Sequence, residues 1–364
     1  MEKKNLLISS WNIQGHTSKG HDKFTDPEFI TNIKNSDIIC LMETLSGPED
    51  NLEIPDFKAI HLVRPKSKKS RKRFGGISVY VKSCLKRGIK FLKHQTNDYI
   101  WLQLCRSFFG LKKDIFICYM YNPPSDSSYT KSLDLDYFDI LEKEISLFSE
   151  QGQNILGGDL NARTGIGFDF IKEDNGAHFP LFDGYCPDNK LSQRQSMDKI
   201  VTSRGRQLND LCIQLGLRIL NGRIFGDSLG QHTSYQYGGN SVIDYFIVSE
   251  QLLEYISFFK VHKFDGLMSD HCKISLMINV NCFLHVVNPK LTGIPNKYKW
   301  DDNSETKFKL ALESNLVKAL IKEFENSISN NFSIEKNKIE NIVNNFNKII
   351  YDAADQCLKK KGEP

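Results

Sequence analysis

Near the middle of the chain, an apolar run ends in polar side chains of the kinds that bind a water molecule, a metal ion or a phosphate. Residues 154–163 read Asn-Ile-Leu-Gly-Gly-Asp-Leu-Asn-Ala-Arg. Because side chains alternate along an extended chain, Asp159 and Asn161 should face the same way, with apolar Leu160 between them. This strand end therefore predicts a site for a water molecule, a metal or a phosphate.

Four other segments place polar groups beside apolar runs. Asn12 ends the first run, Glu43 follows Ile-Cys-Leu-Met, Asp244 lies within Val-Ile-Asp-Tyr-Phe, and Asp270 and His271 precede the last run. A single polar residue at a strand end is more often a cap than a catalytic group. Asp244 is the exception, because a carboxylate buried among apolar neighbours is costly unless it has a partner.

Several common metal and nucleotide motifs are absent from the sequence. It contains no H-E-x-x-H, no Cys-His spacing suited to zinc and no glycine-rich phosphate loop of the P-loop type. His178 and His232 lie in polar, turn-rich segments and are expected to be solvent-exposed or locally hydrogen-bonded. The nine cysteines are dispersed without a C-x-x-C pair, which indicates reduced thiols in an intracellular compartment.

Short apolar runs alternate with helical patterns through most of the chain. Strands are predicted at residues 6–9, 38–42, 76–81, 100–104, 115–121, 154–157, 242–248 and 274–280. Helices are predicted at 134–148 and 197–215, and residues 165–194 are expected to form a long surface loop near the site. This mixture predicts a layered α/β architecture.

The sequence changes character after Val280. Two amphipathic helical patterns, at 308–324 and 339–350, follow a turn-rich stretch. We predict that residues 1–283 form one domain and that 284–364 form a linker and a helical tail. Two such helices cannot bury their apolar stripes alone, so they are expected to dock on the body or on sequence outside this chain.

The overall composition is that of an ordinary globular protein. The 364 residues are 40% hydrophobic and 25% charged, and the net charge of +4 does not by itself predict a polyanionic partner. The N-terminal apolar run is too short for a signal peptide, and no run approaches the ~20 apolar residues of a membrane span. No membrane association is expected.

Taken in order, the polar segments resemble the endonuclease/exonuclease/phosphatase superfamily, which includes deoxyribonuclease I and the apurinic/apyrimidinic endonucleases. The closer resemblance is to the endonuclease domains of non-LTR retrotransposons, and it spans about residues 5–280. Tyr235 departs from the pattern, because a tryptophan is expected there. The phrases that carry the resemblance are Trp11-Asn12-Ile13, Glu43, Tyr121-Asn122-Pro123-Pro124, Gly158-Asp159-Leu160-Asn161-Ala162-Arg163, Asn221-Gly222-Arg223, Ile243-Asp244-Tyr245 and Ser269-Asp270-His271.

The resemblance implies a four-layer α/β/β/α sandwich of the deoxyribonuclease I type with a C-terminal helical extension. It also implies a metal: Glu43 would be the principal ligand of Mg²⁺, with Mn²⁺ as an alternative ion. Asn12 would orient Glu43 or join the metal shell, and Asp270 would be a second ligand. Tyr121 would contact the phosphate or assist the leaving group, and we prefer it to Tyr119 because it begins the Tyr-x-Pro-Pro phrase.

The remaining chemical roles also come from the resemblance. Asp159 would position or deprotonate the attacking water, and Asn161 would contact the phosphate or steady that water. His271 would donate to the phosphate while Asp244 holds its orientation and charge. The expected activity is nicking of target DNA to leave a 3′-hydroxyl for target-primed reverse transcription, in the nucleus, with a reverse transcriptase region that this chain does not contain.

A basic cluster lies between His61 and Phe74, where seven Lys or Arg residues occur without an acid. It is either the solvated tip of a hairpin or a contact to DNA phosphates, and we predict the second for Lys68, Lys69, Arg71 and Lys72. Neutralising these four should weaken DNA binding and reduce the slope of log affinity against log salt by about one for each lost phosphate contact. Fluorescence anisotropy at several salt concentrations measures both, and unchanged values would make the cluster a solubilising loop.

Three alternatives stay open from the sequence. The chain could be an abasic-site repair nuclease or another phosphoesterase of the same superfamily, such as a phosphatase of lipids or inositol phosphates, because a fold alone does not choose among them. It could be an inactive DNA-binding or protein-interaction relative, although such a relative would not need the full set of acids, amides and histidine. The helical tail could carry the main function as a dimerisation or docking element.

Overall fold

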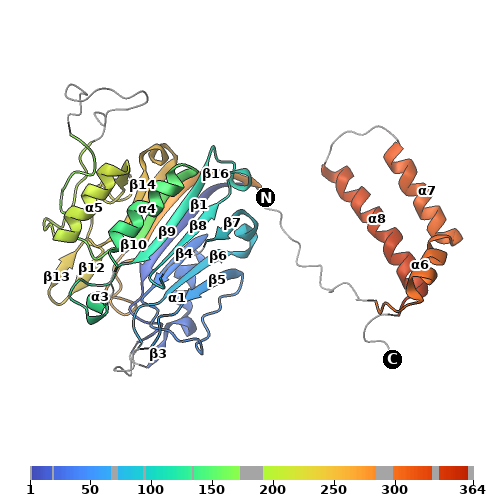
Figure 1. The fold of residues 1–364 in the computed structure, drawn as a ribbon, viewed down its shortest axis with the longest axis horizontal. Coiled ribbons are helices and arrows are strands. Elements are labelled where there is room, and N and C mark those ends of the chain that lie inside the picture. The colour runs from blue at the N-terminus through green and yellow to red at the C-terminus, as the bar shows by residue number, and fades with distance from the viewer. Residues whose placement is uncertain are drawn as a thin grey trace. The chain divides into compact units, whose positions relative to one another are not determined.

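Two six-stranded sheets form the body of the protein (Figure 1). The first has the order β15-β16-β1-β4-β6-β5, with bounds Ile256–Val261, Ile274–Phe283, Glu2–Asn12, Ile38–Met42, Ile77–Lys82 and Phe57–Leu62. The second has the order β11-β14-β10-β9-β8-β7, with bounds Leu217–Ile219, Asp244–Ser249, Gly152–Asp159, Asp114–Tyr121, Tyr99–Leu104 and Ile89–Phe91. Two short hairpins add β2 (Thr17–Ser18) with β3 (His21–Asp22), and β12 (Ser234–Gln236) with β13 (Gly239–Ser241).

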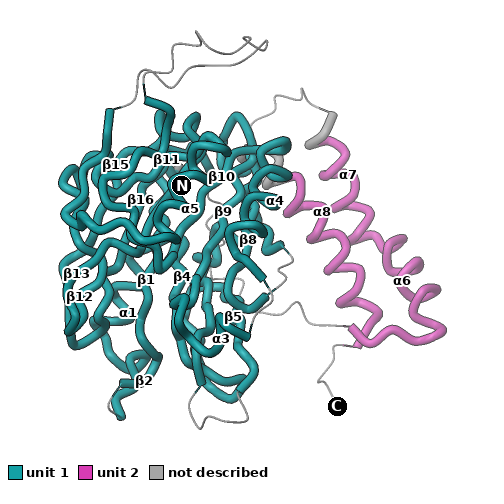
Figure 2. Tube along the Cα trace, turned by 60° about the vertical axis from the view of Figure 1, so that its left-hand side comes forward, with its two compact units in different colours: residues 1–286 teal, residues 287–364 magenta. Residues whose placement is uncertain are grey.

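This computed structural model describes residues 2–18, 20–66, 73–92, 96–132, 135–172, 192–283, 298–329 and 336–359. They fall into two compact units, residues 1–286 and 287–364, which Figure 2 colours separately. The predicted boundary at 283/284 adjoins residues 284–297, which lie outside the described residues. Within the described part of the chain, no helix is both long and apolar enough to span a membrane.

Helices cover the outer faces of the sheets. The body contains α1 (Pro27–Lys34), α2 (Arg106–Phe109), α3 (Ser128–Ser132), α4 (Tyr137–Ser149) and α5 (Ser203–Gln214), with short 3₁₀ turns at Lys23–Thr25, Ser83–Gly88 and Glu250–Tyr255. The apolar face of α1 packs with Trp11 and Leu41 of the first sheet, and α4 and α5 pack with Trp101 and Tyr245 of the second. The layers therefore run helix, sheet, sheet, helix, and the predicted α/β/β/α sandwich is confirmed.

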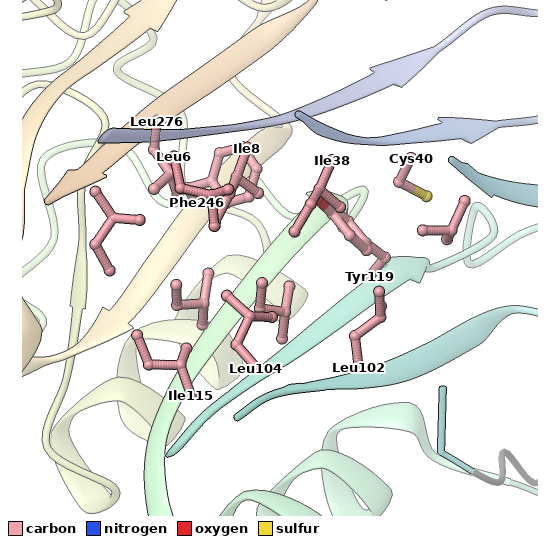
Figure 3. Packing of buried hydrophobic residues seen from close by; sticks show 14 of the residues in the cluster. Leu6, Ile8, Ile38, Cys40, Leu102, Leu104, Ile115, Tyr119, Phe246 and Leu276 are labelled. Atoms are coloured by element: carbon pink, nitrogen blue, oxygen red, sulfur yellow. The ribbon is translucent and has the colours of Figure 1, made fainter. Parts of the chain in front are cut away.

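The largest apolar core lies between the two sheets. It joins Leu6, Ile8 and Leu276 of the first sheet to Leu102 and Phe246 of the second, all with no exposed surface. Figure 3 shows these side chains interleaved between the facing strands. Burial of this kind contributes about 25 cal/mol per Å² of apolar surface, so the paired sheets form a rigid base for the polar strand ends.

Strand pairing brings distant polar residues to the same end of the body. In the second sheet Asp159, the last residue of β10, lies opposite Tyr121 of parallel β9 and opposite Asp244 of antiparallel β14. In the first sheet Asn12 of β1 lies opposite Met42 of parallel β4, immediately before Glu43. Asn12, Tyr121 and Asp159 therefore end their strands, Asp244 begins β14 and Glu43 directly follows β4, so strand pairing within each sheet brings these polar residues to neighbouring strand ends.

Helix α5 begins later than its apolar pattern predicts. The expected helix at 197–215 starts only at Ser203, where the side chain of Thr202 accepts a hydrogen bond from the backbone N of Gly205. Before that cap, the carboxylate of Asp198 accepts from the backbone N of Ile200 and of Val242, which fixes a non-helical backbone. The predicted start at Met197 was wrong, because side-chain hydrogen bonds outweigh an apolar period there.

The described residues of the second unit, the helical tail, form three helices rather than the two predicted. It contains α6 (Ser304–Leu312), α7 (Asn315–Ser329) and α8 (Lys336–Cys357). The predicted helix at 308–324 is interrupted after Leu312, where Ser314 Oγ accepts from the backbone N of Val317 and caps a new helix. Buried Val317, Ile349 and Ala353 form a core of its own, so part of each apolar stripe is covered within the unit.

Candidate active site

An amide joins the two sheets at the site. Asn12 Nδ2 donates to Glu43 Oε1 and to Asp159 Oδ2, both at 3.0 Å, while Asn12 Oδ1 accepts from the backbone N of Gln14 at 3.0 Å. Asn12 and Asp159 are each 1% exposed. The three contacts fix which way the amide points, and in this orientation its N–H groups hold the two carboxylates from opposite sheets together.

The imidazole of His271 lies between the carboxylates of Asp159 and Asp244. His271 Nδ1 is 2.8 Å from Asp244 Oδ2, and His271 Nε2 is 4.0 Å from Asp159 Oδ2. All three side chains are buried, at 5% exposure or less. Since Asp244 occupies the Nδ1 side, the Nε2 side faces Asp159 and Asp270, the latter at 3.9 Å.

Backbone contacts keep this acid and histidine pair in place. The backbone N of Asp244 donates to Thr233 Oγ1 at 3.0 Å, and Asn221 Nδ2 donates to the backbone O of Asp244 at 3.0 Å. The backbone N of His271 donates to Ser269 Oγ at 3.0 Å, and Ser269 Oγ in turn donates to the backbone O of Asn12. The predicted pair is thus tied to the strand end that carries Asn12.

Asp270 lies beside the loop that follows β1. Its Oδ2 accepts from Gln14 Nε2 at 3.1 Å, and its buried Oδ1 has no hydrogen-bond partner among the described residues. Gln14 therefore contacts Asn12 through its backbone and Asp270 through its side chain. Gln14 could not be identified from the sequence, because nothing in an Asn-Ile-Gln-Gly string shows which polar side chain points toward the site.

The structure separates the two candidate tyrosines. Tyr119 is fully buried in the core between the sheets, and its hydroxyl has no hydrogen-bond partner among the described residues. Tyr121 ends β9 at 6% exposure; burial raises its pKa well above the ordinary value, and the carboxylates of Glu43 and Asp159 raise it further. Tyr121 is therefore the tyrosine beside the carboxylates, and its phenol stays protonated at neutral pH.

The Gly-Gly-Asp-Leu-Asn segment has the backbone that its composition requires. Gly158 has φ +139°, and a Cβ there would lie 2.1 Å from the backbone O of Met120, so only glycine lets β10 approach β9 this closely. Asn161 has φ +45°; its backbone N donates to Asp159 Oδ1 at 3.0 Å, and its Nδ2 donates to the backbone O of Asn122 at 2.8 Å. The turn directs the backbone N–H of Asn161 to the Asp159 carboxylate and its side-chain amide to Asn122.

Burial and charge set the protonation of the central groups. Burial raises the pKa of Asp159, and the nearby carboxylates of Asp244 and Glu43 raise it further. For His271, burial lowers the pKa, but the charge and hydrogen bond of Asp244, with help from Asp159 and Asp270, raise it to about 10. His271 is therefore an imidazolium at neutral pH, and it balances part of the negative charge around Asp159.

These shifts predict a dependence of stability on pH. Because the folded pKa of His271 lies above its ordinary 6.5, its stabilising contribution is complete below about pH 6.5 and is lost as the pH rises through about 10. The raised pKa of Asp159 acts in the same direction. Urea unfolding in EDTA should show a free energy of unfolding that falls over this window, and less steeply in Asp244→Asn. Equal slopes for the two proteins would contradict the assignment.

Comparison with known proteins identifies the family to which this chain belongs. A profile of the Endonuclease/Exonuclease/phosphatase family matches residues 9–271. The chain belongs to this family. A DNA-(apurinic or apyrimidinic site) endonuclease of Dictyostelium discoideum is 23% identical over 304 residues, covering 77% of this chain and 73% of the relative.

Two solved structures are similar to the body. An AP endonuclease from Leishmania major superposes with a TM-score of 0.52 at 15% identity, over 76% of this chain and 88% of that one. A 3′-5′ exonuclease from Neisseria meningitidis gives a TM-score of 0.47 at 14% identity, over 74% and 98%. The first likeness supports the deoxyribonuclease I type of fold. Family membership and the buried Asp159, Asp244 and His271 group make the chain a metal-dependent nuclease or phosphodiesterase.

The family's divalent metal fits the residues present. One carboxylate oxygen from each of Asp159 and Asp244 and one ring nitrogen of His271 lie within 4.8 Å of one another. However, His271 Nδ1 is already hydrogen-bonded to Asp244, which leaves only Nε2 of this imidazole to face a metal. The carboxylate of Glu43 and Asp270 Oδ1, which has no hydrogen-bond partner among the described residues, also offer oxygen donors of the kind that a divalent ion prefers.

Other residues of the motifs have contacts that could not be predicted from the sequence. Arg163 has a structural partner: its Nε and Nη2 donate to Asp198 at 2.8 and 2.7 Å. Tyr235 lies in hairpin β12–β13 with its backbone N donating to Asp270 O, and its ring packs 4.5 Å from that of Phe264. The predicted DNA contacts Lys68, Lys69, Arg71 and Lys72, like His178, lie outside the described residues.

Proposed function

We propose that this chain is a Mg²⁺-dependent DNA endonuclease of the retrotransposon type, which nicks one strand of duplex DNA and leaves a 3′-hydroxyl for target-primed reverse transcription. The observation that carries the nuclease chemistry is the junction of the two sheets, where Asn12 holds Glu43 and Asp159 together and Asp244 holds His271 beside them. The retrotransposon role rests on the sequence phrases that resemble such endonuclease domains. A nuclear place of action and a separate reverse transcriptase region belong to the same proposal.

The reaction needs several groups acting together. Phosphodiester hydrolysis requires a reduction of the barrier of about 8–23 kcal/mol, whereas one general acid or base supplies about 10²–10⁴-fold in rate. When bound at Glu43 and Asp270, the metal would polarise a phosphate oxygen and offset the negative charge that builds there. The remaining steps fall to side chains of this chain.

Asp159 would take the proton from the attacking water. Its raised pKa moves the carboxyl toward the pH at which the enzyme works, which is where a general base is most effective. The side-chain amide of Asn161, held by Asn122 while the backbone N of Asn161 donates to Asp159, would steady that water for in-line attack. Asn12 would keep the base and the metal ligand Glu43 at a constant separation.

His271 and Tyr121 would stabilise the phosphate as it reacts. The Nε2–H of the His271 imidazolium would donate to a phosphate oxygen, with Asp244 holding the ring on its Nδ1 side. Tyr121, protonated at neutral pH, would donate its phenol proton in a hydrogen bond to the phosphate or to the leaving oxygen. Both donors would strengthen their bonds as negative charge develops, which lowers the barrier rather than only binding the substrate.

A second candidate function is repair of abasic sites. It is favoured by the similarity to the Dictyostelium discoideum protein named as an apurinic or apyrimidinic site endonuclease. The two functions use the same chemistry and differ in which DNA reaches the site. A substrate comparison is therefore needed to separate them.

The test measures kcat/KM in Mg²⁺ on three substrates: an intact duplex, the same duplex with one abasic site, and a phosphoinositide. Our proposal expects strand nicking of the intact duplex and a product end that a polymerase extends. A preference for the abasic duplex of about 10³-fold or more, the equivalent of roughly 4 kcal/mol, would establish the repair function instead. Turnover of the phosphoinositide alone would make the chain a phosphatase of the family.

A further inference from the structure

A buried arginine lies beside Tyr121, outside the groups that the reaction uses. Arg64, which follows β5, is 7% exposed, and its Nε donates to Asp98 Oδ1. Its guanidinium carbon lies 5.2 Å from the centre of the Tyr121 ring and 3.9 Å from the centre of the Tyr129 ring. The cation is therefore held between the faces of two tyrosines, and one of these is the proposed phosphate donor.

The surroundings are built to hold this cation in one place. Asp98 is fully buried; its Oδ2 accepts from the hydroxyls of Tyr129, at 2.8 Å, and of Tyr137. Its backbone O accepts from the backbone N of Tyr121 at 2.8 Å, so the same residue anchors both the guanidinium and the end of β9. A Cβ at Gly75, which has φ +66°, would lie 2.5 Å from the guanidinium of Arg64.

The hydrogen bonds of Arg64 do not explain its burial by themselves. Its Nη2 is enclosed and has no hydrogen-bond partner in the described part of the chain, which is costly for a charged group. Among the described residues, the guanidinium also lies over the faces of Tyr121 and Tyr129, and a ring face attracts a cation, more strongly when water is excluded. A charge in this position also favours negative charge on the Tyr121 oxygen, because attraction is strong in a desolvated site.

We propose that Arg64, fixed by Asp98, is a positioning residue that acts through Tyr121: it holds the ring at the end of β9 and makes its phenol a stronger hydrogen-bond donor to the reacting phosphate. This inference rests on the proposed role of Tyr121. It predicts an effect on the transition state rather than on DNA affinity, since Arg64 is enclosed by protein side chains.

The test is a double-mutant cycle on nicking of a labelled duplex, with Tyr121→Phe, Arg64→Met and the two combined. Arg64→Met should lower kcat about 10-fold and leave KM within about 2-fold. In the Tyr121→Phe background, the same change should cost less than about 2-fold, because the group through which Arg64 acts has been removed. An equal loss in both backgrounds, an unchanged kcat, or an effect confined to KM would each overturn the inference.

Two controls separate this role from simple structural support. Arg64→Met combined with Asp98→Asn removes both charges of the pair and should fold, by circular dichroism, with the same loss in kcat. Arg223→Met breaks another buried pair, in which Arg223 Nη2 lies 2.6 Å from Asp169 Oδ1; it should lower the melting temperature without changing kcat. If Tyr121→Phe itself nicks like wild type, the role of Tyr121 in the proposed function fails, which is a different result from failure of the cycle.

Discussion

Asp159→Asn is expected to lower kcat for DNA nicking by about 10³-fold while leaving the protein folded. Asp159 accepts hydrogen bonds both from Asn12 of the other sheet and from the backbone N of Asn161. Its carboxylate also lies 4.0 Å from His271 Nε2. An asparagine keeps the shape but cannot accept a proton from water at neutral pH. Loss of a general base typically costs about 10²–10⁴-fold in rate.

The same substitution should have two opposing effects on stability. Burial and the carboxylates of Asp244 and Glu43 raise the pKa of Asp159, so removing its charge relieves a cost in the fold. Both carboxylate oxygens accept hydrogen bonds, however, and an asparagine would turn its NH2 group toward one of the donors, Asn12 Nδ2 or Asn161 N, at a cost of about 1–3 kcal/mol. The melting temperature in EDTA should therefore change little while activity collapses. Activity within about 3-fold of wild type would remove Asp159 from the role of base.

Asp198 supplies a matched control for this variant. It is another buried aspartate, and it binds Arg163 through two hydrogen bonds and lies in the segment before α5. Asp198→Asn should lower the free energy of unfolding by about 1–3 kcal/mol, because the Arg163 guanidinium loses its charged partner. Its kcat should stay near that of wild type, the opposite pattern to Asp159→Asn.

His271→Ala is expected to lower kcat by about 10³-fold, since it removes the cationic donor whose Nε2 faces the Asp159 side of the site. Asp244→Asn should cost less, about 10²-fold, because the imidazole remains but loses the charge and hydrogen bond that hold it protonated and oriented. The two losses should not add: the double variant is expected to match His271→Ala within about 3-fold.

Single-turnover kinetics on a nicked-product assay measures these variants without a contribution from product release. A change confined to KM would mean that His271 binds DNA without helping the chemical step. Losses that multiply in the double variant would show that Asp244 acts independently of His271. Either result would contradict the arrangement in which the carboxylate works through the imidazole.

Local sequence patterns identify some of the polar groups at the strand ends. Asp159 follows a glycine pair at the end of an apolar run, and Asp244 is an acid inside an apolar segment, where a buried charge is costly. The extended alternation expected for Asp159 and Asn161 does not hold, because β10 ends at Asp159 and Asn161 has φ +45°. Only the family resemblance predicts that these side chains lie close together. The local sequence of one strand does not show that β10 pairs with β9 and β14.

Contacts between distant segments lay beyond that reasoning. Arg64 reads as the first member of an exposed basic run, yet it is buried, because Asp98 and Tyr129 come from elsewhere in the chain to enclose it. Arg163 reads as part of the catalytic phrase but is bound by Asp198. The start of α5 and the break after Leu312 were missed because side-chain caps, not apolar periodicity, decide where those helices begin.

The central claim is that Glu43 and Asp159, held by Asn12, form a metal-dependent phosphodiesterase centre that nicks DNA. The most direct measurement incubates supercoiled plasmid with the wild-type chain and with Glu43→Gln, in Mg²⁺ and in EDTA. The account predicts open-circular product from wild type in Mg²⁺ only, with a rate at least about 10²-fold lower for Glu43→Gln. Plasmid left intact by wild type, or nicking by Glu43→Gln at the wild-type rate, would contradict it.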